Sequence, residues 1–119
     1  MAWEYRHALG DMRDAIDGIM TATAGKTLAD YSGDWLLRHA VQRGIEIVSE
    51  ASRALPDDVK ALRPEIPWPR VRAIGNVLRH EYSGLSDQVI WGVVIDELPR
   101  LKEAVAALEA AARGPGQER

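Results

Sequence analysis

The sequence predicts an all-α fold, an up-and-down bundle of four main helices. Phenylalanine is absent from the chain, and β-branched residues occur only in short runs. Apolar residues instead recur at spacings of three and four, as on one face of an amphipathic helix. With 119 residues, the chain is long enough for one domain and too short for two. We expect a single helical domain over residues 1–112 and a flexible tail over residues 113–119.

Two amphipathic stretches predict the first two helices. The first covers residues 3–24, and Gly25 is placed to end it. A turn region follows, in which Ser32 or Asp34 can cap a second helix over residues 34–55. The apolar stripe of this second helix consists of Leu37, Val41, Ile45, Val48 and Leu55, widened by Leu36, Ala40, Ile47 and Ala51. So wide an apolar surface predicts a helix at the centre of the bundle.

Four prolines mark the connection to the third helix. Residues 56–69 form one long irregular segment, with one turn of helix expected at 57–62. Trp68 followed by Pro69 is typical of a helix start, because proline is favoured at the first helical position. We expect the third helix to continue to about Tyr82.

The last helix is predicted from a long apolar stripe. Ser86 is a good N-cap for it, and the stripe continues to about residue 112. Its apolar residues are Val89, Ile90, Val93, Val94, Leu98, Leu101, Val105 and Leu108. Pro99 falls inside the stripe and is expected to kink the helix or split it.

The stretch VRAIGNVLRHEYSG, residues 71–84, concentrates polar groups on the third helix. Arg72, Asn76 and His80 are spaced four residues apart, so they form one polar ladder on the helix. The packing side opposite consists of Val71, Ile74 and Leu78. A histidine beside an arginine is sufficient for RNA cleavage without a metal, because imidazole exchanges protons near neutral pH and guanidinium stabilises charge on phosphoryl oxygens. The alternative is an ordinary polar helix face.

Gly75 is unusual inside this helix. Glycine costs up to about 1 kcal/mol there relative to alanine. Its presence suggests either a close approach between helices or room for another group. Arg79 follows four residues later, and its side chain is expected to cover the surface that Gly75 leaves bare.

Charge is unevenly distributed along the chain. The net charge of −3 argues against a dedicated binder of duplex DNA. Between residues 60 and 80, however, a single acid, Glu65, faces a group of basic side chains: Lys60, Arg63, Arg70, Arg72, Arg79 and His80. This region is expected to attract a phosphodiester or to form a solvated helix face.

Other polar groups have simpler interpretations. The chain has no cysteine, which excludes disulfides and thiolate metal sites. His7 and His39 lack partners at metal-ligand spacing. Glu46 and Glu50 are four residues apart and could bind a divalent metal, but ion pairs with the arginines three residues away, Arg43 and Arg53, are favoured. The tryptophans Trp35, Trp68 and Trp91 are interpreted as core or dimer-interface residues. The charged N-terminal stretch is neither a signal peptide nor a membrane span, which indicates a cytoplasmic protein.

Several motifs occur together in a specific order. They are an R-x-x-E-x-x-x-E-A helix, a P-x-I-P-W segment, the sequence N-x-L-x-H-x-Y, and a helix with L-P-x-L. Over residues 36–108 this order resembles the HepT-like branch of the HEPN superfamily. The resemblance implies a helical bundle that dimerises. The polar stretch of residues 71–84 from each of the two protomers then faces one shared cleft.

The resemblance also implies a function. Members are toxins of toxin–antitoxin pairs, act as metal-independent ribonucleases without a cofactor, and are encoded beside an MNT-type nucleotidyltransferase. That partner neutralises the toxin by transferring AMP to a tyrosine. Carried over, His80 is the catalytic histidine, Asn76 its polar neighbour and Tyr82 the modified residue.

One position departs from the family motif. An arginine is expected directly before Asn76, where this chain has Gly75. Arg79 and Arg72 are the candidates to replace it. Three interpretations remain open: an active toxin ribonuclease that cleaves RNA, a catalytically inactive binding subunit that serves as partner or substrate of the nucleotidyltransferase, and a helical dimer with a scaffolding role.

Overall fold

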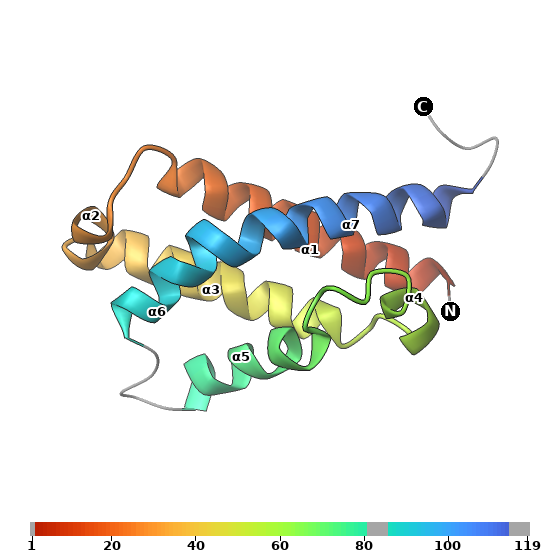
Figure 1. The fold of residues 1–119 in the computed structure, drawn as a ribbon. Coiled ribbons are helices and arrows are strands. Elements are labelled where there is room, and N and C mark those ends of the chain that lie inside the picture. Colours follow the sequence, from red (N-terminus) through yellow and green to blue (C-terminus); the bar gives the residue numbers. More distant parts are fainter. Residues whose placement is uncertain (1, 81–85, 115–119) are drawn as a thin grey trace.

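The computed structural model describes residues 2–80 and 86–114, with the backbone alone for residues 2–4, 79 and 80 (Figure 1). Within these ranges all regular structure is helical, which confirms the all-α class. The helices are α1 (Ala2–Thr23), α2 (Leu28–Ser32), α3 (Trp35–Ser52), α4 (Asp57–Lys60), α5 (Trp68–His80), α6 (Asp87–Gly92), the π-helix η1 (Val93–Glu97) and α7 (Leu98–Arg113). The longest stretches fall in the four expected regions, and α2 and α4 are short additions. No helix among the described residues is long and apolar enough to cross a membrane.

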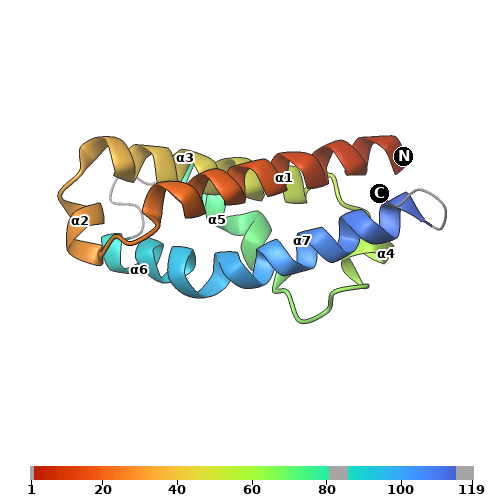
Figure 2. The same ribbon diagram turned by 90° about the horizontal axis from the view of Figure 1, so that it is seen from above.

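The helix α3 is central, as predicted. It packs against α1 on one side and α5 on the other, while α1 also packs against α7 (Figures 1 and 2). Its main stripe is buried, but the predicted widening is wrong in part. Leu36 is 70% exposed and Ala40 is also exposed, because no helix of the described chain covers that side of α3.

The segment between α1 and α3 was expected to be a turn, but it contains the helix α2. The Thr27 side chain accepts a hydrogen bond from the Asp30 backbone, and the Asp30 carboxylate accepts one from the Thr27 backbone. This reciprocal cap makes a helix of only five residues possible. The helix buries Tyr31, whose ring centre lies 5.5 Å from that of Trp91. Asp34, rather than Ser32, then caps α3 by accepting from the Leu37 backbone.

The start of α5 is fixed by Trp68. Its indole Nε1 donates to the carbonyl oxygens of Lys60 and Arg63, each at 3.1 Å. These bonds tie α5 to α4 and to the connection after it. The predicted turn of helix in this connection is confirmed as α4, and the predicted helix start at Trp68 and Pro69 is confirmed as well.

The last helical run changes character in its middle. Ser86 caps α6 as predicted, by accepting from the Val89 backbone. The π-helix η1 follows, and Pro99 lies in the first turn of α7, where its missing N–H costs no helical hydrogen bond. The kink expected at Pro99 remains a prediction.

Candidate active site

Gly75 lies at a close contact between α5 and α3. Its backbone N–H donates to the Ser49 Oγ at 3.1 Å, and the Ser49 Oγ donates to the Arg72 carbonyl at 2.8 Å. A Cβ atom at position 75 would lie 2.6 Å from the Ser49 Oγ and 2.7 Å from the Ser49 Cβ. Such distances are shorter than real carbon contacts, so a side chain at position 75 requires one helix to move.

This contact decides between the two explanations for Gly75 in favour of close helix approach. Gly75 is buried, and the Ser49 side chain lies against it. The Arg79 side chain lies outside the described residues, so its expected cover over Gly75 stays a prediction.

The first two residues of the polar ladder on α5, Arg72 and Asn76, have the predicted orientation. Arg72 and Asn76 are both exposed, whereas Val71, Ile74 and Leu78 are partly buried against the core. Both polar residues line one groove of about 630 Å³. His80 follows Asn76 by four residues at the end of α5, so its backbone position is next to that of Asn76 on the helix surface.

The groove is predominantly cationic. It lies between the end of α3, the helix α4 and the first half of α5. Arg53, Lys60 and Arg72 supply positive charges, and Asp57 is the single acidic residue among the described residues that line it. Arg53 also lines a small cavity of about 40 Å³ beside Gly75, so it lies near the position where the family motif has arginine.

Arg53 is a residue that the sequence interpretation missed. It was expected to pair with Glu50, but it forms no ion pair within the described part of the chain, and neither does Arg72. The other expected pair, about two turns earlier on α3, does form, with Arg43 Nη1 at 3.2 Å from Glu46 Oε1. The residues described contain no cluster of ligands suited to a metal ion.

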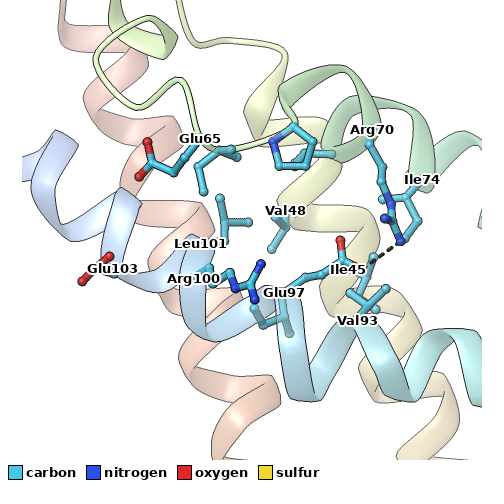
Figure 3. Close-up of a pocket in the computed structure, with 14 residues that line it drawn as sticks. Ile45, Val48, Glu65, Arg70, Ile74, Val93, Glu97, Arg100, Leu101 and Glu103 are labelled. Carbon is cyan, nitrogen blue, oxygen red and sulfur yellow. Dashed lines mark hydrogen bonds and ion pairs between the residues drawn. The ribbon is translucent and has the colours of Figure 1, made fainter.

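The basic region between residues 60 and 80 is divided between two sides of α5. Arg70 points toward the last helical run, where its Nη2 lies 2.8 Å from Glu97 Oε2 (Figure 3). Arg63 donates to Glu65 and Glu103, and its hydrogen bond holds the pKa of the Glu65 carboxyl below its ordinary value. The charges of Arg63 and Arg70 are therefore balanced locally, unlike that of Arg72.

Figure 3 shows a second groove, on the side of α5 that faces η1 and α7. Apolar side chains from α3, α5, η1 and α7 line it, among them Ile45, Val48, Ile74 and Leu101. Carboxylates and arginines also line it. Its volume is about 490 Å³, and of the predicted site residues whose side chains the structure describes, neither Arg72 nor Asn76 lines it. These two residues line the groove on the other side of α5 instead.

The remaining predicted residues differ in their surroundings. Trp68 is buried and Trp91 is half-buried, but Trp35 is 63% exposed and therefore not a core residue. Its ring stacks on His39, with ring centres 4.0 Å apart, and the His39 Nδ1 lies 2.7 Å from the Trp35 carbonyl oxygen. The side chains of Arg79 and His80, and the whole of Tyr82, lie outside the described residues.

Comparison with known proteins defines the class. The model of the family described as Ribonuclease HepT-like matches residues 12–108, so the chain belongs to the HepT-like family of the HEPN superfamily. "Probable ribonuclease HepT" of Thermococcus cleftensis is 35% identical over 102 residues, which are 86% of this chain and 93% of that protein. "Putative RNase MJ1380" of Methanocaldococcus jannaschii is 28% identical over 97 residues, 82% of this chain and 89% of that protein. No solved structure gives a significant match.

Proposed function

We propose that this protein is a metal-independent endoribonuclease and the toxin of a toxin–antitoxin pair. The observation that carries the proposal is family membership, together with similar proteins whose names describe ribonucleases. The sequence N-x-L-x-H-x-Y at residues 76–82 supplies the residues to which the activity is assigned.

His80 is the acid–base residue in this proposal. Its imidazole removes the proton from a ribose 2′-hydroxyl, or donates one to the leaving 5′-oxygen. The 2′-oxygen forms a bond to the adjacent phosphorus while the bond from phosphorus to the 5′-oxygen breaks. Asn76, one helical turn before His80, is its polar neighbour. Neither step requires a metal or a cofactor.

A guanidinium must stabilise the charge that develops on the phosphoryl oxygens. Gly75 cannot supply it, and Arg79 and Arg72 are the candidates. Arg79 is adjacent to His80 in sequence. Arg72 lies eight residues before His80, about 12 Å along the helix axis. Arg79 is therefore the better candidate for the scissile phosphate.

Control by an MNT-type nucleotidyltransferase belongs to the same proposal. The partner transfers AMP from ATP to the hydroxyl oxygen of Tyr82, and pyrophosphate leaves. Tyr82 is two positions after His80 in the sequence, so an added AMP would place negative charge and bulk beside the catalytic imidazole and exclude RNA. The active form is a homodimer in the cytoplasm.

A second function is an inactive binding subunit that serves as partner or substrate of the nucleotidyltransferase. The contact between Gly75 and Ser49 favours it, because packing between α3 and α5 leaves no space for the family arginine at that position. The two functions differ in one measurable respect, the cleavage of RNA.

The test is cleavage of total RNA and tRNA by the purified protein in EDTA, with His80→Ala prepared identically. Cleavage that disappears with His80 supports the ribonuclease. Equal cleavage by both proteins indicates a contaminating nuclease. No cleavage by either, from a folded dimer that carries no AMP on Tyr82, supports the binding subunit.

The dimer is tested separately by light scattering at micromolar concentration. A dimer is expected, because the proposed cleft is formed by the polar stretch of residues 71–84 from each of two protomers. A monomer would contradict the shared cleft, whatever the cleavage assay shows.

A further inference from the structure

We infer that the groove between α3, α4 and α5 binds the sugar–phosphate backbone of a single RNA strand that leads to His80. Arg53, Lys60 and Arg72 are its phosphate-binding residues. The inference rests on the proposed ribonuclease and adds to it a binding surface that includes Arg53, which lies outside the catalytic motif.

The first reason is the direction of the groove. The residues of α5 that line it include Trp68, Arg72 and Asn76, each four residues after the one before. His80 is the next position in this series. Residues at this spacing share one helix face, so a strand that follows the groove along α5 is directed toward His80.

The second reason is the state of the arginines. Arg43, Arg63 and Arg70 form ion pairs with glutamates in the structure. Arg53 and Arg72 are exposed and form no ion pair among the described residues. Arg53 directly follows α3, which carries Arg43, and Arg72 lies on α5 with Arg70. Guanidinium groups without a carboxylate partner are available to phosphate, which they bind through paired N–H donors.

The third reason is the composition of the lining. Apart from the charged residues and Asn76, the described lining residues are apolar, namely Ala61, Pro64, Trp68, Pro69 and Ala73, and Trp68 is 7% exposed. Because the indole is buried and its N–H is bonded to the backbone, it is not available to stack on a base. Cations with apolar residues between them suit recognition of the charged backbone without reading of bases.

Lys60 completes the cationic set. Its amino group is 3.9 Å from the Asp57 carboxylate, a long ion pair with a carboxylate that is fully exposed to water. Such a contact contributes little and can exchange for a phosphate. Arg72 lies about 12 Å along the axis of α5 from His80, and Arg53 and Lys60 line the same groove, so we assign to the three cations phosphates that flank the scissile one.

The experiment measures binding of a fluorescently labelled single-stranded oligonucleotide with 2′-O-methyl ribose at every position. This probe lacks the attacking hydroxyl, so binding is measured without cleavage. Anisotropy titrations at several salt concentrations compare the wild type with Arg53→Gln, Lys60→Gln, Arg72→Gln and the triple variant. The matched controls are Arg43→Gln on α3 and Arg70→Gln on α5, which remove the same charge from residues already paired with glutamates.

Each groove variant is expected to lower the slope of log affinity against log salt by about 0.7, the value for one phosphate contact on a single strand. The slope of the triple variant should be smaller in magnitude than that of the wild type by about 2. Between about 50 mM and about 200 mM salt, the wild-type affinity should then fall about 20-fold more than that of the triple variant. The control variants should keep the wild-type slope. Circular dichroism and melting of each variant confirm that the fold is retained.

Two results would overturn the inference. One is a triple variant with the wild-type affinity and slope, and the other is a wild type that does not bind the probe. Failure of the ribonuclease proposal gives a different result, namely groove-dependent binding of the probe without cleavage of unmodified RNA. If unmodified RNA is cleaved normally by the triple variant, the ribonuclease stands and the groove assignment fails.

Discussion

The hydroxyl group of Ser49 links α3 to α5 at the position where the HepT-like motif has arginine. It accepts a hydrogen bond from the Gly75 N–H and donates one to the Arg72 carbonyl oxygen. Both residues at this contact are buried, and no Cβ fits at position 75 beside Ser49. The packing between the two helices therefore excludes a side chain at position 75, and in the proposed mechanism the guanidinium comes from another position.

The first prediction concerns this contact. Gly75→Ala should destabilise the protein by about 1 to 2 kcal/mol, because overpacking costs about 1–3 kcal/mol and exceeds the gain in helix propensity. Ser49→Gly in the same chain removes the clash, so the two changes should couple by about 0.5–3 kcal/mol. Urea denaturation of the two single variants and the double variant measures this coupling. A Gly75→Ala protein as stable as the wild type would contradict the close contact.

The second prediction separates Arg79 from Arg72. Arg79→Ala should lower kcat about as much as His80→Ala does, by about 100-fold or more, because it removes charge stabilisation in the transition state. Arg72→Ala should mainly raise KM, because a flanking phosphate is held equally in substrate and transition state. Steady-state cleavage of a defined RNA measures both constants. If Arg79→Ala is as active as wild type while Arg72→Ala loses kcat, the catalytic arginine is Arg72.

The third prediction compares two tryptophans. Trp68→Ala should cost about 3–5 kcal/mol, because the ring is buried and its N–H holds the connection to α5. Trp35→Ala should change the stability of the protomer by less than about 0.5 kcal/mol, because its ring is largely exposed. Thermal and urea unfolding of both variants at one protein concentration provides the measurement. A large loss for Trp35→Ala that depends on protein concentration would instead place Trp35 in the dimer interface.

The fourth prediction concerns acid. Hydrogen bonds from the Thr27 backbone and side chain lower the pKa of Asp30 from its ordinary value of 3.8. The folded state therefore gains stability from ionised Asp30 above the unfolded pKa and loses this gain as the pH falls through the lowered pKa. When the pH is lowered from above to below 3.8, the melting temperature of Asp30→Asn should fall less than that of the wild type. An identical acid dependence of the two proteins would show that the cap does not contribute.

Most of the fold could be predicted from the sequence because it depends on local patterns. Apolar spacing determines the long helices, and the caps at Asp34 and Ser86 and the start at Trp68 depend on neighbouring residues. The helix α2 was not predicted, since its reciprocal cap is local but its stability depends on burying Tyr31 against the distant Trp91. The exposure of Leu36 was also missed, because apolar character does not tell whether another helix covers a position.

The candidate site shows the same division. The sequence by itself determined the ladder of Arg72, Asn76 and His80, because spacing of four residues places side chains on one helix face. Only the tertiary structure decided that Gly75 packs against Ser49 and that Arg53 joins Arg72 in one groove. Gly75 and Ser49 are 26 positions apart in the chain, and Arg72 and Arg53 are 19 positions apart. Both relationships therefore depend on how α3 packs against α5. Local sequence determines which face a side chain occupies, whereas the partner across that face is determined by the packing of helices.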